Sequence, residues 1–181
     1  MGTCDDAMRM AMEGAARLCV TRRHYEIESE HFFTKAVELD HGDLAFILEH
    51  YGANRSRLLA ELRGSLDRLK TGNTRGPAFS PVVVKMLFGA WSIATLNFEA
   101  IQIRTGHALM ALSEDGLVRL LHENSKELRK ISLEALQKDF TNIVAASNET
   151  HGARLSDETV RDEENEKVGP RYVLPFSINS R

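Results

Sequence analysis

The placement of proline limits this chain more than any other sequence feature. Both long stretches, 1–76 and 82–169, lack proline, since the only four are Pro77, Pro81, Pro170 and Pro175. Stretches of this kind that are rich in Ala, Leu, Glu, Arg and Met favour helix. Apolar residues at three- and four-residue steps predict a first helix over about 5–22, namely Met8, Met12, Ala15, Ala16, Cys19 and Val20. The sequence therefore predicts an all-α fold.

Capping residues divide the rest of the first half into helices. Ser29 can cap a short second helix, and a third, over about 44–48, should stop before Gly52. Asn54 can cap a fourth helix, and turn residues then indicate a linker over 71–79. Ser80 followed by Pro81 is a strong start signal, which predicts a fifth helix over about 81–97.

The pattern then repeats at a constant offset of 76 residues. Residues 27–38 align with 103–114, which places His31 on His107, each four residues after an isoleucine. Leu44, Ile47 and Leu48 align with Leu117, Leu120 and Leu121 once the next loop is shortened by three residues. Thr105 takes the capping role of Ser29, and Ser125 can cap a final helix to about 146. We therefore predict one domain over 5–146, free of β-sheet, with repeat one at about 5–70 and repeat two at about 80–146.

The C-terminal segment 147–181 differs in composition. Acidic residues crowd 157–166 with few apolar partners, which predicts little regular structure. The apolar stretch 171–178 follows, and it is either an extended piece that docks somewhere or the start of a further region.

Composition argues against several classes of protein. A net charge of −3 gives no reason to expect nucleic acid or an anionic membrane as partner. No stretch approaches an 18-residue apolar span, and the N-terminus lacks a signal-peptide pattern. Two cysteines, Cys4 and Cys19, do not favour a disulfide framework, so we expect a reducing cytoplasm.

Motifs for catalysis or cofactor binding do not occur in the sequence. It has no Gly-Lys pair for a phosphate loop and no Cys-x-x-Cys, and His122-Glu123 lacks the second histidine of a zinc motif. His31 and His107 could form a shared metal site, but a partly buried imidazole bonded to a backbone carbonyl or a cap is the favoured interpretation. Trp91 is expected in the core. We therefore predict no enzyme, no cofactor and no metal.

The duplicated unit with Ile-x-x-x-His at its second helix resembles the Clp N-terminal domain of Clp/Hsp100 disaggregases. The stretch 13–31, with His24-Tyr25 and Glu28-Ser29-Glu30-His31, resembles more specifically the ClpV family, the type VI secretion ATPases. This resemblance implies a protein-interaction domain that recognises an N-terminal helix of the contracted sheath subunit VipB (TssC). An attached AAA+ ring, absent from this sequence, would then pull the sheath apart.

An apolar groove for that helix is predicted where the first and fifth helices meet. Its lining should come from Met8, Met12, Ala15, Val83, Val84 and Leu87. The alternative is that all six residues are core. Other functions remain open: a general disaggregase domain that binds adaptors or exposed apolar segments, or an oligomerisation or scaffold module.

Overall fold

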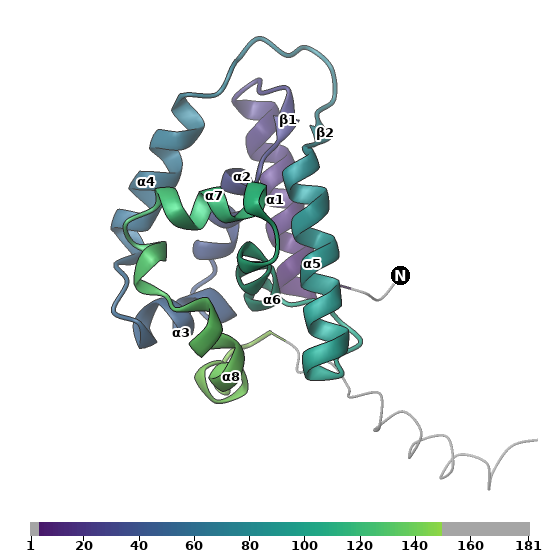
Figure 1. Cartoon of the computed structure of the whole chain (residues 1–181). Helices are drawn as coiled ribbons and strands as arrows, with labels where there is room; N and C mark the ends of the chain where they lie inside the picture. Colours follow the sequence, from purple (N-terminus) through teal and green to yellow (C-terminus); the bar gives the residue numbers. More distant parts are fainter. Residues whose placement is uncertain (1–3, 150–181) are drawn as a thin grey trace, which may run out of the picture.

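The computed structural model describes residues 4–149, so the predictions for 150–181 lie outside the described residues (Figure 1). The predicted all-α class is confirmed. In chain order the elements are α1 Asp6–Thr21, β1 Glu26–Ile27, α2 Ser29–Val37, α3 Asp43–His50, α4 Arg55–Asp67, β2 Ala78–Phe79, α5 Pro81–Phe98, α6 Thr105–Met110, η1 Ala111–Ser113, α7 Gly116–Asn124, η2 Leu128–Lys130 and α8 Leu133–Ile143.

The two-residue strands were not predicted, and they correct the expectation that 5–146 contains no sheet. β1 and β2 pair in parallel, with Ile27 opposite Phe79. The Ile27 carbonyl also accepts the Ser80 N–H at 3.1 Å. This short ladder therefore joins the segment that follows α1 to the segment that precedes α5.

Three helix boundaries follow the predicted local signals. Ser80 accepts the Val83 N–H at 3.2 Å, with Pro81 as the first residue of α5. Asn54 accepts the Arg57 N–H at 2.9 Å and begins α4. Gly52 follows α3 with a φ of 63°, a left-handed conformation that glycine adopts without strain.

The predicted caps Ser29 and Thr105 are wrong by one residue. The N-caps are Glu28 and Arg104, and the backbone N–H of each donates to the Nδ1 atom of the histidine three residues later, at 2.9 Å for His31 and 3.2 Å for His107. The expected bond of each histidine to a cap residue is thus confirmed, but both imidazoles are fully buried and not partly buried as predicted. The shared arrangement supports a duplication, although the division into repeats at the stated boundaries stays a prediction.

Burial explains why both imidazoles can accept these hydrogen bonds. His31 and His107 are 0% and 1% exposed. Burial, with a smaller contribution from His24, lowers the pKa of His31 to about 4. Burial and the nearby Arg104 guanidinium lower the pKa of His107 to about 3. Both side chains are therefore neutral at pH 7, and each has an unprotonated nitrogen for the cap.

The predicted final helix from Ser125 to about 146 is wrong. Ser125 instead accepts the Leu128 N–H and precedes the 3₁₀ turn η2, while Ser132 caps α8. Contacts with α4 explain the interruption: Ser125 donates to Glu61, and the Glu127 carboxylate accepts the Asn54 N–H at 2.7 Å. These tertiary hydrogen bonds hold 125–131 as a turn although its residues can form helix.

A buried polar cluster joins the loops before α3 and α6. The Arg104 guanidinium binds the Asp43 carboxylate through Nε at 3.0 Å and through Nη2. The Glu149 carboxylate accepts the N–H groups of Asp43 and Thr105, each at 2.7 Å. Burial and the neighbouring Asp43 carboxylate raise the pKa of Glu149 to about 7. Glu149 thereby fixes the last described residue to two helix starts.

Helices α1 and α5 run in opposite directions (Figure 1), and the chain is linked at both of their ends. The Asp5 N–H, just before α1, donates to the Ile103 carbonyl beyond the end of α5, at 3.1 Å. At the other end, β1 follows α1 and pairs with β2, which precedes α5. Among the described helices, α5 alone is long and apolar enough to cross a membrane by length and composition, but part of it lies in the domain core.

Candidate partner-binding surface

The structure divides the six predicted groove residues into two groups. The first group lies in the core, and each of its residues is 0% exposed: Met8, Ala15 and Val83. Met12 and Leu87 are partly buried and pack against the core, and the Val84 side chain is 40% exposed. The three core residues cannot meet a partner without rearrangement. The predicted groove therefore stays a prediction, now centred on Met12, Val84 and Leu87.

An exposed apolar line on α5 extends from Val84. Val84, Phe88 and Trp91 are 40%, 71% and 51% exposed and follow one another at i, i+4 and i+7. With 3.6 residues per turn, these positions lie within about 60° of one another around the helix. We call these three residues the α5 stripe. The expectation that Trp91 is a core residue is wrong.

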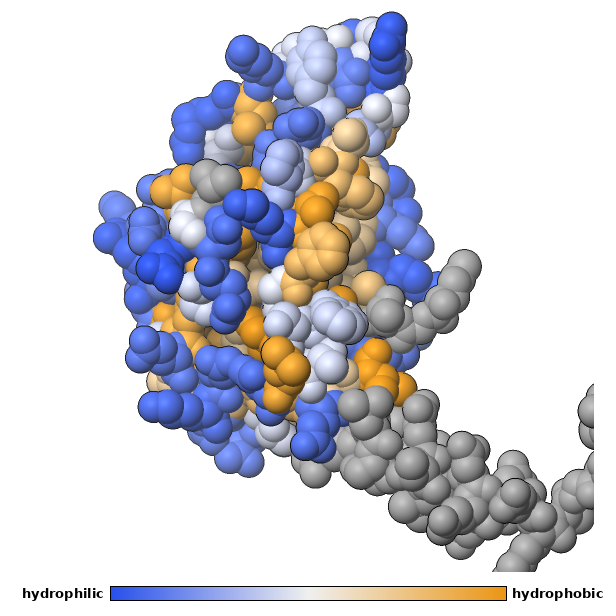
Figure 2. Space-filling model, turned by 45° about the vertical axis from the view of Figure 1, so that its right-hand side comes forward, coloured by the Kyte–Doolittle hydropathy of each residue, from blue (hydrophilic) through white to orange (hydrophobic). Residues whose placement is uncertain are grey.

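The opposite side of α5 explains why the stripe faces outward. Val83, Met86, Ala90 and Ile93 are buried and fill the core side of the helix. Figure 2 shows an apolar band on the face where α5 comes forward, bordered by hydrophilic side chains. A helix that is apolar on both sides has more apolar surface than the domain core covers. The apolar surface that stays exposed indicates a partner site.

One flank of α5 is covered by η1 and the start of α7. Lys85 forms an ion pair with Asp115 at 2.9 Å, and a Cβ atom added to Gly89 would lie 3.1 Å from the Ala111 side chain. Leu87 lies on the other flank, because it is about 160° from Lys85 around the helix. The stripe therefore lies between a flank covered by η1 and α7 and a flank with a partly buried leucine.

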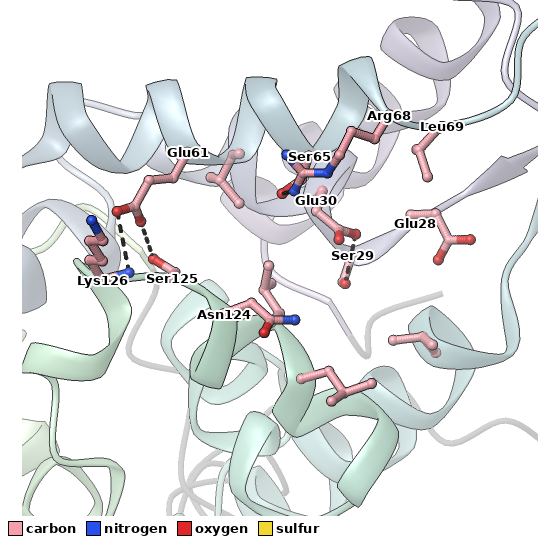
Figure 3. Close-up of a pocket in the computed structure, with 14 residues that line it drawn as sticks. Glu28, Ser29, Glu30, Glu61, Ser65, Arg68, Leu69, Asn124, Ser125 and Lys126 are labelled. Atoms are coloured by element: carbon pink, nitrogen blue, oxygen red, sulfur yellow. Dashed lines mark hydrogen bonds between the residues drawn. The ribbon is translucent and has the colours of Figure 1, made fainter.

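A second concavity lies between α4 and α7 and was not predicted (Figure 3). Its volume is about 610 Å³. Leucines and Val82 lie among polar side chains in its lining: Glu28, Ser29, Glu30, Glu61, Leu62, Ser65, Arg68, Leu69, Val82, Leu120, Leu121, Asn124, Ser125 and Lys126. Glu61 already accepts hydrogen bonds from Ser125 and from the Lys126 N–H. We call this concavity the α4–α7 cleft.

The two surfaces suit different ligands. The α4–α7 cleft has carboxylates and cations along its rim, which suits a small or mixed polar group. The residues of the α5 stripe are uncharged, and they have the spacing of one helix face. The stripe therefore suits the apolar side of another helix. Within residues 4–149, no group of three or more His, Cys, Asp and Glu residues could hold a metal ion. We therefore take the α5 stripe as the candidate partner-binding surface.

Comparison with known proteins places the fold in a family. The family model of the Clp repeat (R) N-terminal domain matches residues 4–124. The AAA+ ATPase ClpV1 of Pseudomonas aeruginosa is 32% identical over 148 residues, which are 81% of this chain and 16% of ClpV1. The chaperone protein ClpB of Yersinia enterocolitica is 31% identical over 153 residues, which are 84% of this chain and 17% of ClpB.

A solved structure shows the same fold with a ligand. In a complex of a ClpV N-domain with a VipB peptide, the similar chain has a TM-score of 0.66 and 25% identity, with 82% of this chain and 91% of that chain covered. The chain thus spans about a sixth of the length of its full-length relatives but nearly all of this isolated domain. Because the family model covers most of the described helices, the chain belongs to the Clp repeat N-terminal domain family.

Proposed function

We propose that this chain is the recognition domain of a ClpV-like AAA+ unfoldase. It binds an amphipathic helix at the N-terminus of the contracted type VI sheath subunit VipB (TssC), so that the ring can disassemble the sheath. The observation that carries the proposal is the α5 stripe, three exposed apolar side chains at helical spacing. The complex of a similar ClpV N-domain with a VipB peptide supports the choice of partner.

A partner helix suits the stripe because of its shape and lack of charge. The stripe runs along about 10 Å of α5, which matches two turns of a second helix with apolar residues at i, i+3, i+4 and i+7. A short helix that buries several apolar side chains against the stripe, less its ordering cost, should bind with a dissociation constant in the micromolar range, which corresponds to a binding free energy of about −8 kcal/mol. We expect affinity to fall only modestly with salt, since the stripe residues are uncharged.

The test uses two substitutions of exposed residues on α5. Phe88 lies on the stripe and is 71% exposed, whereas Leu96 is 76% exposed and lies about 80° around the helix from Phe88. A labelled peptide of the sheath subunit's N-terminal helix is titrated with each variant, and fluorescence anisotropy is measured. Phe88→Asp should weaken binding at least about tenfold, since it buries a charge, and Leu96→Asp should bind as the wild type does. Equal affinity of Phe88→Asp and wild type would place the site elsewhere.

A second candidate function is a general disaggregase domain that binds exposed apolar segments, which the similarity to ClpB favours. A sheath-type domain should prefer one defined helix, so unfolded casein in excess should not displace the labelled peptide. Displacement would support the general function instead. An oligomerisation or scaffold role predicts self-association, which sedimentation of the chain measures.

We also propose that this chain does no nucleotide chemistry of its own and acts in the bacterial cytoplasm. The lack of a Gly-Lys pair in the whole sequence supports the first point. Titration with a fluorescent nucleotide tests it, and saturable micromolar binding would contradict it.

A further inference from the structure

We propose that the α5 stripe has a ligand within the same chain, the apolar segment Tyr172–Ile178, which binds the stripe in competition with a partner. The segment lies outside the described residues, and its sequence is Tyr-Val-Leu-Pro-Phe-Ser-Ile. The competition rests on the proposed function, whereas the binding of the segment to the stripe does not.

The composition of the C-terminal residues singles out this segment. Residues 156–170 contain six acidic and two basic side chains, with Val160 and Val168 as the only large apolar residues. Six of the seven residues from Tyr172 to Ile178 are then apolar or aromatic. A polar spacer followed by an apolar block is a pattern that favours binding of the block alone, because the spacer cannot bury enough surface to become ordered.

The sequence of the segment favours an extended conformation, which would place alternate side chains against α5. Pro175 cannot continue a helix, and the residue before a proline prefers an extended conformation. In an extended segment, Tyr172, Leu174 and Phe176 point to one side and span about 13 Å. The α5 stripe spans about 10 Å from Val84 to Trp91. The two sets of side chains are therefore matched in length and in apolar character.

The described end of the chain lies close enough for this contact. Glu149 binds the Thr105 N–H at 2.7 Å, and Thr105 follows the end of α5 by seven residues. Figure 1 shows the last described residues near the C-terminal end of α5. Twenty-two residues separate Glu149 from Tyr172, and a flexible chain of that length would span about 26 Å on average. The length of α5 is about 27 Å, so the segment reaches the stripe without strain.

The tether sets the size of the effect on a partner. A linker of this length gives an effective concentration on the order of 1 mM. An intrinsic dissociation constant of about 0.1 mM for the segment then gives a bound form about tenfold more populated than the free form. The apparent affinity for a partner on the same stripe falls by about the same factor.

Trp91 is the only tryptophan of the chain and lies on the stripe, so its fluorescence reports directly on the contact. The test compares the full chain with the double variant Leu174→Asp/Phe176→Asp, without any partner present. The control is Val160→Asp/Val168→Asp, which adds the same charges to the spacer. Emission wavelength and quenching by acrylamide are measured, with circular dichroism as the check on folding.

We expect the segment variant to shift Trp91 emission to longer wavelength and to increase quenching, and the spacer variant to match the wild type. A synthetic peptide of residues 170–180, added to the segment variant, should reverse the shift. Identical emission of all three chains would overturn the proposal, as would an equal shift in the spacer variant. A shift that depends on chain concentration would also overturn it, because a second copy would then occupy the stripe.

Discussion

The substitution Gly106→Ala tests whether α6 packs against α8 in the way that the structure shows. Gly106 lies in the first turn of α6, beneath the Phe140 ring of α8 and beside the Asp43 carboxylate. A Cβ atom at this position would lie 2.4 Å from Phe140 Cε2 and 2.8 Å from Asp43 Oδ2. Ordinary van der Waals contacts of a Cβ atom begin at about 3.4 Å, so the ring must move by about 1 Å.

Such a movement is costly because the Phe140 ring is enclosed. Phe140 is 3% exposed and contacts the rings of Phe98 and His107, with centroid distances of 5.1 and 5.2 Å. The Arg104 guanidinium lies 5.5 Å from the centroid of the same ring. Forcing one methyl group into a packed core costs about 1–3 kcal/mol. The helix preference of alanine over glycine returns about 0.5–1 kcal/mol. Because the ring must move by about 1 Å, we take the upper part of this cost, about 2–3 kcal/mol, and the net loss of unfolding free energy should be about 1–2.5 kcal/mol.

Gly64→Ala is the matched control. Gly64 lies inside α4, where the nearest atom to an added Cβ is a terminal Arg68 nitrogen at 4.0 Å. This variant should gain about 0.5–1 kcal/mol, since only the backbone preference changes. Urea unfolding followed by circular dichroism measures both variants. A Gly106→Ala protein as stable as wild type, alongside a stabilised Gly64→Ala protein, would refute the packing of α6 against α8.

Three further predictions concern buried ionisable side chains. Arg104→Met should lower the unfolding free energy by about 3–5 kcal/mol in urea titrations, because it leaves the buried Asp43 carboxylate without its partner; a loss below about 1 kcal/mol would contradict this. The pKa of Glu149 is raised, so the folded state binds an extra proton between pH 4.5 and about 7; the stability of wild type relative to Glu149→Gln should fall as pH rises through this window. The pKa of His107 is lowered, so the unfolded state binds the extra proton between about pH 3 and 6.5; the stability of wild type relative to His107→Asn should rise with pH there. Flat differences in these two pH series would contradict the assigned pKa shifts.

Local signals were enough to predict three of the helix boundaries. The start of α5 at Ser80-Pro81, the cap at Asn54 and the turn at Gly52 each depend on neighbouring residues alone, and each is confirmed. The interruption at Ser125 could not be predicted, because it depends on Glu61, which lies 64 residues away in the chain.

The exposed face of α5 was missed for a different reason. Phe88 and Trp91 have the composition of core residues, and α5 is apolar all round, so its periodicity does not show which side faces inward. Only the contacts of the other helices decide that Val83 and Met86 are buried while Phe88 is not. The surplus of apolar residues in α5 was a usable signal, since a helix with a single buried face does not need them.

Photo-crosslinking from α5 tests whether the α5 stripe binds the N-terminal helix of the sheath subunit. The photoreactive amino acid p-benzoylphenylalanine replaces either Phe88 on the stripe or Leu96 beside it, in the full chain. Each protein is irradiated with the purified contracted sheath, and the adducts are identified by mass spectrometry. We expect an adduct between position 88 and the N-terminal helix of the sheath subunit, with little or none from position 96. Adducts from position 96 alone, or from neither position while the chain still binds the sheath, would contradict it.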